Sequence, residues 1–306
     1  MKLAFIGGVK YSLDLLSHLI KNDILVSQVF SYDESKKSLY SDYASFDEIT
    51  KQYGIPHEKV ANINDAKNIK ILQELKPDII LVMGWSQILK EDILKTPQIA
   101  TIGSHPTELP KYRGRAPIPW SIIKGLNESA LTFFYMDVGI DDGDILDQKK
   151  FSINENDDAS SLYEKMTEAG KQMLLENLPK LVDGTAKRTK QDESKFIEYW
   201  EKRTPEDGEI DWSQNNEKIH TLIRATTKPY PGAFSFWQKS KLVIWKSNYS
   251  NDMKSSPGKI IKVNTNGVWV GTGNGSVIIQ EVNFKGKDLP SNKLFSSVDE
   301  GKFLKG

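Results

Sequence analysis

The chain has 306 residues, lacks cysteine and carries a formal net charge of zero, because 41 basic residues balance 41 acidic ones. This length allows two domains with sizeable cores, and the lack of cysteine excludes disulfide bonds, thiolate nucleophiles and most structural zinc sites. A balanced charge argues against a polyanionic substrate such as tRNA. A local basic patch on a neutral protein could still bind such a substrate.

The N-terminal apolar run is too short for a signal peptide. No segment approaches the roughly 20 apolar residues that a membrane helix needs. We therefore expect a soluble, cytoplasmic protein that does not bind membranes.

Short apolar runs alternate with amphipathic segments along the first half of the chain. Residues 3–6 predict a buried strand that ends in Gly7-Gly8, and a helical pattern follows through residues 13–20. The next elements predicted in chain order are a strand over 24–32, a polar loop over 33–45, a helix over 46–53, a short element over 56–60, a helix over 65–75 and a strand over 78–84. This alternation predicts a parallel sheet covered by helices on both faces. The dinucleotide motif G-x-G-x-x-G is missing, so a dinucleotide site is not supported.

Three loops carry the first candidate site residues. Gly7-Gly8, Gly84-Trp85 and His105-Pro106 each follow a predicted strand. Ligands of such sheets collect at the carboxyl ends of the strands. We therefore expect these three loops to converge on one cleft.

The second half of the chain has a different pattern of predicted elements. A helix is predicted over 160–181, and a polar connection follows over 183–194. Beyond about residue 199, short strands at 242–245, 267–270 and 276–279 are separated by glycine, asparagine and serine turns, which is typical of a compact β domain or small barrel. We place the domains at residues 1–198 and 199–306.

One histidine and one acidic loop suggest acid-base chemistry. His105 carries an imidazole, a side chain that can accept and release protons in catalysis, and a carboxylate such as that of Asp141 could orient it and stabilise its charged form. The alternative for His105 is a strand-end histidine that only packs. The acidic loop over 137–144 lacks the ligand spacing of a calcium loop, so no metal site is predicted. A plain solvated turn is its other alternative, but Gly139 and Gly143 would let the backbone approach a flat ring closely.

The segments 104–120 and 137–146 resemble the folate-dependent formyltransferases, in which a histidine of an H-P-x-x-L-P motif works with an aspartate of a D-x-G loop. These positions match His105 and Asp141. The sequence R-G-R-A-P-I-P-W at 113–120 looks like the branch that formylates amino groups on nucleotide-linked sugars. Residues 203–208 and 229–234 look like second-domain signatures shared with methionyl-tRNA formyltransferases. The resemblance implies an α/β protein with a Rossmann-like catalytic domain and an oligonucleotide-fold-like (OB-like) C-terminal barrel.

The resemblance also implies binding residues. A pteridine ring of 10-formyltetrahydrofolate, the formyl donor, would contact the loops that hold Met83, Trp85, Ile88, Leu89, Asp137 and Gly139. Ile88 and Leu89 are equally compatible with ordinary core at the start of a helix.

Three residues are candidates for binding the sugar nucleotide. Arg113 and Arg115 fit phosphate recognition, because a guanidinium makes two charge-assisted bonds. Loop salt bridges with Glu108 or Asp137 are the alternative. Tyr11, directly after the glycine turn, could also meet the sugar nucleotide.

One position departs from the family pattern. Relatives carry an asparagine two residues before the histidine, and this chain has Gly103 there. Ser104 cannot replace it, because neighbouring residues of an extended segment point to opposite faces. Another loop residue, with Gln87 as a candidate, a backbone amide or a water would have to supply the missing donor. Otherwise the activity is weaker or different.

The resemblance implies an enzyme that transfers a formyl group from 10-formyltetrahydrofolate to the amine of a nucleotide-linked deoxyamino sugar. Its product would serve a surface glycan such as lipopolysaccharide O-antigen, and a homodimer is compatible with this function. The alternatives are a methionyl-tRNA formyltransferase and a catalytically silent folate- or nucleotide-binding scaffold, which Gly103 alone favours. His18, His57 and His220 lack a neighbouring constellation and are predicted to lie on the surface or on helix faces.

Overall fold

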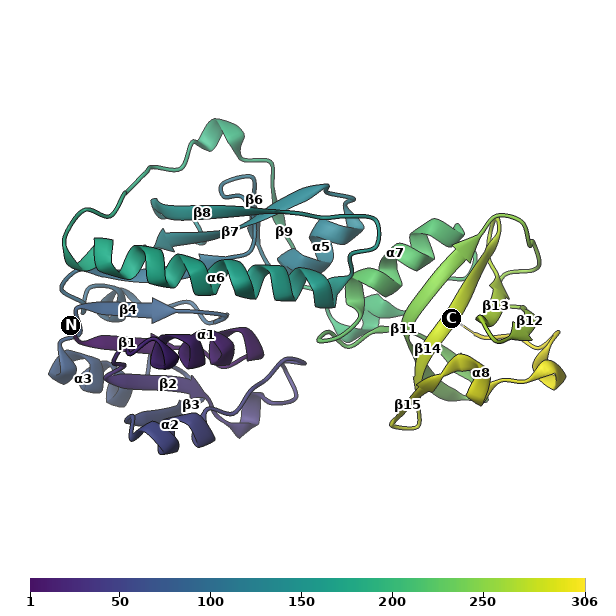
Figure 1. The fold of residues 1–306 in the computed structure, drawn as a ribbon, viewed down its shortest axis with the longest axis horizontal. Coiled ribbons are helices and arrows are strands. Elements are labelled where there is room, and N and C mark those ends of the chain that lie inside the picture. Colours follow the sequence, from purple (N-terminus) through teal and green to yellow (C-terminus); the bar gives the residue numbers. More distant parts are fainter. Residues whose placement is uncertain (306) are drawn as a thin grey trace. The chain divides into compact units, whose positions relative to one another are not determined.

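The computed structural model describes residues 1–305, and contacts divide them into two compact units (Figure 1). The first unit comprises residues 1–117, 127–153 and 163–201, and the second comprises 118–126, 154–162 and the chain from 202 onward. The predicted boundary lay at 198/199, but the short segments 118–126 and 154–162 pack with the second unit. None of the helices within residues 1–305 is both long and apolar enough to cross a membrane.

The first unit is built on a seven-stranded sheet in the order β3-β2-β1-β4-β5-β7-β8. Its parallel part consists of β1 (Leu3–Ile6), β2 (Gln28–Tyr32), β3 (His57–Val60), β4 (Ile79–Val82) and β5 (Ala100–His105). This part confirms the parallel sheet expected from the sequence. Two long strands, β7 (Glu128–Tyr135) and β8 (Ile145–Ser152), extend the sheet in antiparallel fashion and were not predicted. A separate parallel pair joins β6 (Tyr112–Gly114) to β9 (Glu198–Trp200).

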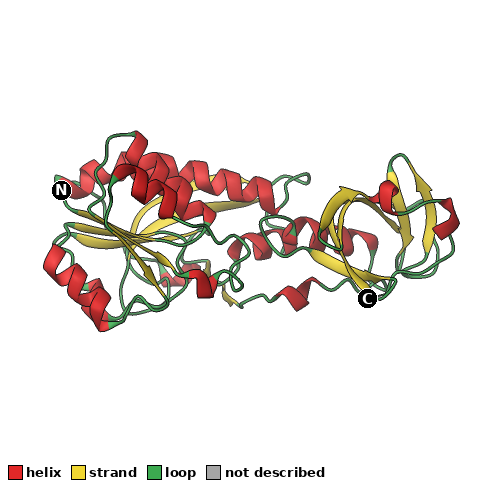
Figure 2. Cartoon of the chain, turned by 90° about the horizontal axis from the view of Figure 1, so that it is seen from below, coloured by secondary structure: helices red, strands yellow, loops and turns green. Residues whose placement is uncertain are grey.

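Helices cover both faces of this sheet, as Figure 2 shows. They are α1 (Lys10–Lys21), α2 (Asp47–Tyr53), α3 (Ala66–Leu75), α4 (Glu91–Leu94) and most of α6 (Ala159–Val182), with 3₁₀ turns η1 (Glu34–Lys36) and η2 (Glu193–Lys195). Because strand side chains alternate between faces, Ala4 and Ile6 pack with Leu72 of α3 and Ile93 of α4. The intervening Phe5 lies near Phe46, at the start of α2. The sheet is therefore buried on both sides.

The strand order brings three loops together. Ile6 is paired with Val82, and Val82 is paired with Gly103, so β1 and β4 end at the level of Gly103, two residues before the end of β5. The segments after Ile6, Val82 and Gly103 are therefore neighbours at one edge of the sheet.

The second unit is an antiparallel sheet in the order β10-β11-β14-β13-β12, with β15 paired to β14. The strands are β10 (Ala233–Trp237), β11 (Ser240–Ser250), β12 (Ile260–Asn264), β13 (Gly267–Gly271), β14 (Ser276–Phe284) and β15 (Lys287–Pro290). The remaining elements are α5 (Pro117–Ile123), most of which belongs to this unit, α7 (Asn216–Thr226), α8 (Ser291–Leu294), η3 (Pro205–Gly208) and η4 (Ser297–Asp299).

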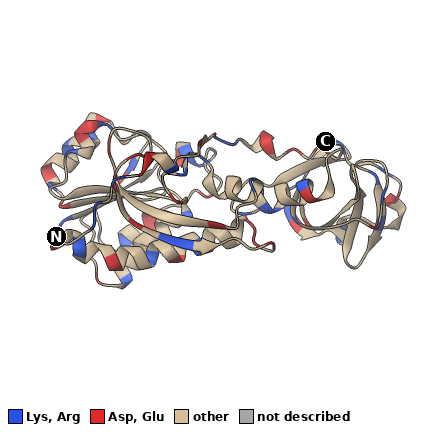
Figure 3. Ribbon diagram, turned by 90° about the horizontal axis from the view of Figure 1, so that it is seen from above, with Lys and Arg blue, Asp and Glu red and all other residues tan. Residues whose placement is uncertain are grey.

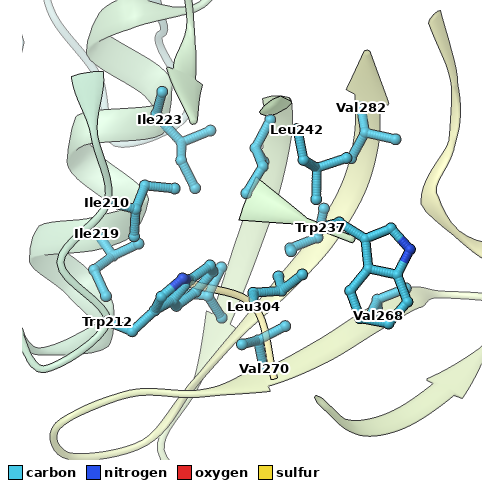
Figure 4. Packing of buried hydrophobic residues seen from close by; sticks show 14 of the residues in the cluster. Ile210, Trp212, Ile219, Ile223, Trp237, Leu242, Val268, Val270, Val282 and Leu304 are labelled. Atoms are coloured by element: carbon cyan, nitrogen blue, oxygen red, sulfur yellow. The ribbon is translucent and has the colours of Figure 1, made fainter. Parts of the chain in front are cut away.

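The last described residues link the two edges of this sheet. Lys305 forms a bridge to Phe236 of β10, and Phe303 forms one to Lys259, directly before β12. Since β10 and β12 are the two edge strands, this segment closes the sheet into the small barrel that the sequence predicts. Figure 4 shows its interior, where Ile219 and Ile223 of α7 point toward Ile210 and Trp212.

Candidate active site

His105 is the last residue of β5 and is almost completely buried, with 5% of its surface exposed. Its Nε2 lies 2.9 Å from the carbonyl oxygen of Tyr112. A carbonyl oxygen only accepts hydrogen bonds, so Nε2 is the nitrogen that carries a proton. Nδ1 is therefore the ring nitrogen that can take up a further proton.

Asp141 faces that second nitrogen. Its Oδ2 lies 3.6 Å from Nδ1 of His105, an ion-pair distance that is too long for a hydrogen bond. The same oxygen accepts a hydrogen bond of 3.1 Å from the backbone amide of Gly114. The carbonyl oxygen of Asp141 accepts a second bond from Gln191, which also binds the carbonyl oxygen of Gly143. Asp141 is thus held from both sides, although its φ of 54° is one that L residues seldom adopt.

There is no space for a side chain at Gly103, two residues before His105. A Cβ on Gly103 would lie 2.8 Å from Cγ of Met136 and 2.9 Å from Cζ of Phe134. These two side chains occupy the space that an asparagine at position 103 would need. A hydrogen-bond donor for a substrate carbonyl does not come from this position.

Tyr11 does not reach a substrate site in this structure. Its side chain is 3% exposed, and its hydroxyl would lie 2.9 Å from a Cβ on Gly170 of α6. Burial raises the pKa of Tyr11, and the Ser104 side chain offsets part of this rise without forming a hydrogen bond of good geometry. Ser104 therefore faces α1 and α6, opposite to His105, as strand alternation predicts.

Gln87 is not free to replace the missing asparagine. Its Oε1 accepts a hydrogen bond of 3.0 Å from the amide of Ile63, and its Nε2 donates one of 2.7 Å to the carbonyl of Ala61. The side chain ties the loop after β4 to the loop after β3. The hypothesis that Gln87 supplies the donor is therefore not supported, because both ends of its amide are engaged.

The candidate folate residues fall into two groups. Met83 and Leu89 are core residues, with 0% and 3% exposure. Ile88 is 66% exposed, and Trp85 is half-buried with an indole Nε1 that has no hydrogen-bond partner among residues 1–305. Of these four, only Ile88 and Trp85 can touch a ligand.

The loop between β7 and β8 also offers apolar surface. Asp137 and Gly139 are exposed, and a Cβ on Gly139 would collide with the Asp142 carboxylate. Val138 and Ile140, which sequence reasoning missed, are 64% and 53% exposed. Exposed apolar side chains on both loops suit a flat ring. The alternation of Asp137, Gly139 and Asp141 with two apolar residues was the signal that could have revealed them.

Arg113 is a buried structural residue. It is 4% exposed, and its guanidinium donates to both carboxylate oxygens of Glu193 and to Oε1 of Gln191. Burial lowers the pKa of Arg113, but the bonds to Glu193 and Tyr199 outweigh it, so the net pKa is raised. The alternative of a salt bridge thus holds for Arg113, but with Glu193 in place of Glu108 or Asp137, and its guanidinium is not free for a phosphate. Glu193 lies 80 residues away in sequence, so no local sequence pattern predicts this ion pair.

Arg115 is placed differently. Its backbone amide donates to the carbonyl of Trp200, and its Nη2 donates to the carbonyl of Ser86 at 3.2 Å. The side chain thus extends from the β6–β9 pair to the loop after β4 and forms no ion pair among those found within residues 1–305. A single bond to a backbone carbonyl can be exchanged for bonds to a phosphate. Within residues 1–305, no cluster of three or more histidine, aspartate or glutamate side chains could hold a metal ion.

Two family models match the chain. The model described as formyl transferase matches residues 1–178, and the one described as formyl transferase, C-terminal domain, matches residues 202–297.

Named relatives fall into two groups. The chain is 38% identical over 249 residues to the bifunctional polymyxin resistance protein ArnA of Wigglesworthia glossinidia brevipalpis, covering 81% of this chain and only 38% of that protein. It is 32% identical over 289 residues to the methionyl-tRNA formyltransferase of Ruminiclostridium cellulolyticum, covering 93% of this chain and 92% of the relative.

Solved structures share the fold. HypX from Aquifex aeolicus in complex with tetrahydrofolic acid has a TM-score of 0.70 at 21% identity, and the match covers 96% of this chain and 46% of HypX. An N-formyltransferase from Helicobacter canadensis in complex with folinic acid and dTDP-3-aminofucose has a TM-score of 0.67 at 23% identity, covering 92% and 99%. From the family models and the full-length relative, this chain belongs to the formyltransferase family of enzymes.

Proposed function

We propose that this enzyme formylates the amino group of a nucleotide-linked deoxyamino sugar and uses 10-formyltetrahydrofolate as donor. The observation that carries the proposal is the pairing of His105 with Asp141 at the end of β5. Exposed Ile88, Val138 and Ile140 on the flanking loops would hold the folate ring. The folate would supply the formyl group, and its nitrogen would take up one proton when the bond to the formyl carbon breaks.

His105, with Asp141 beside it, would carry this proton from the attacking amine to the folate nitrogen. The attacking amine must lose a proton as its bond to the formyl carbon forms, and Nδ1 is the free basic nitrogen of His105. The Asp141 carboxylate, 3.6 Å away, stabilises the imidazolium that results. Such general base catalysis contributes about 10²- to 10⁴-fold to the rate. The backbone bond from Gly114 keeps the carboxylate in place during this transfer.

Two observations favour a nucleotide sugar as the acceptor. Arg115 offers a guanidinium that is held only by a backbone carbonyl, which suits a diphosphate. The N-formyltransferase from Helicobacter canadensis shares the fold and was solved with a dTDP-linked aminosugar. The cellular role in surface glycan synthesis and the cytoplasmic location stay predictions.

The test is a formylation assay with a panel of UDP-, dTDP- and GDP-linked aminosugars and 10-formyltetrahydrofolate, followed by mass spectrometry of the product. We expect one of these sugars to gain a formyl group and His105→Gln to lose the reaction while keeping its thermal melting curve. If no member of the panel is formylated although the protein binds folate, the nucleotide-sugar assignment is wrong.

A second candidate, methionyl-tRNA formylation, is favoured by the distribution of charge. Residues 202–306 contain 16 Lys and Arg against 10 Asp and Glu, so this region carries a formal charge of +6 and residues 1–201 carry −6. The neutral total thus hides a basic C-terminal region, which weakens the sequence argument against tRNA. Figure 3 shows basic and acidic residues interspersed along the ribbon of both units.

Salt dependence separates the two candidates. A tRNA substrate bound through several phosphates would lose affinity steeply as salt rises from 50 to 200 mM. We expect weak tRNA binding and no formylation of methionyl-tRNA. Rapid formylation of methionyl-tRNA with a steep salt dependence would replace the first proposal with the second.

A further inference from the structure

Three aromatic rings stack at the carboxyl ends of β2 and β4. Tyr32, the last residue of β2, lies between Trp85 and Tyr40. The ring centroids are 3.8 Å apart for Tyr32 and Trp85 and 4.6 Å apart for Tyr32 and Tyr40, with interplanar angles of 11° and 10°. Tyr32 has no exposed surface, whereas Tyr40 is only half-buried. The stack therefore ends in a partly exposed ring, and no second aromatic ring pairs with Tyr40 among residues 1–305.

Hydrogen bonds join this stack to the guanidinium of Arg115. The hydroxyl groups of Tyr40 and Tyr32 both reach Oγ of Ser86. The amide of Ser86 donates to the hydroxyl of Tyr32 at 2.9 Å, and the carbonyl of Ser86 accepts from Arg115. Ser86 thus lies between an aromatic surface and a cation that has no carboxylate partner in the described chain.

The loop that carries Tyr40 is already ordered. The hydroxyl of Tyr163 donates to Oδ2 of Asp42 at 2.8 Å and accepts from the amide of Tyr11. Backbone bonds run from Lys10 to the carbonyl of Asp42 and from Ala44 to the carbonyl of Gly8. A ligand would therefore bind to this ring without first ordering the loop, which lowers the entropic cost of binding.

We propose that the face of Tyr40 directed away from Tyr32 is the stacking platform for the nucleobase of the substrate, with Arg115 binding the adjoining diphosphate. This inference rests on the proposed function and adds the nucleoside subsite to it. An aromatic ring next to a cation is the combination that holds a base and its phosphates. Because every base has a π face, the platform stabilises uracil, thymine and guanine alike, and it does not choose among them.

The experiment measures the affinities of the full chain for UDP, dTDP, GDP and inorganic pyrophosphate by isothermal titration calorimetry. We expect Tyr40→Leu to weaken all three nucleotides by about 5- to 100-fold, the loss that follows from removing one stacked base. Tyr40→Phe keeps the ring and should retain nucleotide affinity. Arg115→Met should weaken pyrophosphate and nucleotides together, whereas Tyr40→Leu should leave pyrophosphate unchanged.

Tyr53→Leu is the matched control, because Tyr53 is an exposed tyrosine on α2 outside the stack. Nucleotide affinity unchanged in Tyr40→Leu, or lost equally for pyrophosphate, overturns the platform and leaves the proposed function standing. Failure of every nucleoside diphosphate to bind the unmodified protein overturns the nucleotide-sugar function itself.

Discussion

Met136 leaves no room for a side chain at Gly103, because a Cβ on Gly103 would lie 2.8 Å from Cγ of Met136. Cζ of Phe134 closes the same space at 2.9 Å. In the family resemblance this is the place of an asparagine that polarises the formyl carbonyl. The structure thus fills with apolar groups the space where a hydrogen-bond donor is expected.

We predict that Gly103→Asn destabilises the protein by about 1–3 kcal/mol, the usual cost of overpacking a core. Met136→Ala should relieve this clash, so the double variant should lose less stability than the sum of the two single changes. Urea denaturation of the four proteins measures this coupling. Strict additivity would show that Met136 does not obstruct position 103.

Asp141→Asn should lower kcat by about 10²- to 10⁴-fold, because the amide cannot stabilise the His105 imidazolium. Asparagine tolerates the left-handed backbone of Asp141 and can still accept the bond from Gly114, so the fold should persist. Asp23→Asn is the control, since Asp23 has a φ of 60° and lies directly after α1, away from the site. Equal rates for the two variants would remove Asp141 from the mechanism.

What the sequence could predict was local. The short apolar runs of β1 and β4 end in glycine, and His105 stands where β5 ends, so their meeting at one edge of the sheet follows from a parallel arrangement. The C-terminal strands alternate with turn residues, and this pattern was sufficient to predict a compact β unit. These features depend on residues that are neighbours in the chain.

What the sequence could not predict depends on distant partners. The burial of Tyr11 requires α6, whose Gly170 lies far along the chain. The guanidinium of Arg113 is bonded to Glu193, and the side-chain amide of Gln87 is bonded to the loop after β3. Neither side chain is therefore available for the ligand role that its chemistry suggested. An arginine or glutamine in a loop looks the same in sequence whether it binds a ligand or a backbone carbonyl.

The two arginines of the R-G-R motif should therefore separate experimentally. Arg113→Met removes the hydrogen bonds of a buried guanidinium to Glu193 and to the partly buried Gln191 and should lower the free energy of unfolding by about 1–3 kcal/mol. Arg115→Met should leave stability within about 0.5 kcal/mol but weaken nucleoside diphosphate binding about 10- to 100-fold. Urea denaturation and calorimetric titration of both variants check this. Weaker nucleotide binding in a fully stable Arg113→Met protein would contradict the structural role of Arg113.

His220 of α7 should make the second unit sensitive to acid. Burial, and then the nearby Arg224, lower the pKa of His220 to about 4, with Ser247 hydrogen-bonded to Nδ1 and the Tyr249 ring 5.3 Å away. The unfolded chain protonates this imidazole near pH 6.5, so between pH 6.5 and 4 the unfolded state binds more protons than the folded one. The free energy of unfolding should therefore decrease as the pH is lowered from 6.5 to 4, by at most about 3 kcal/mol from this residue. Below pH 4 this contribution should level off.

The measurement is urea denaturation of the unmodified protein and of His220→Gln between pH 4 and 7.5. Glutamine keeps a polar partner for Ser247 but does not titrate, so the variant should show a shallower dependence on pH. His57 lies on β3 and is half-buried, so its predicted place on the surface or a helix face is wrong, and burial lowers its pKa as well. Its contribution stays in both curves and cancels in their difference. Parallel curves for the two proteins would mean that His220 is as easily protonated in the folded unit as in the unfolded chain.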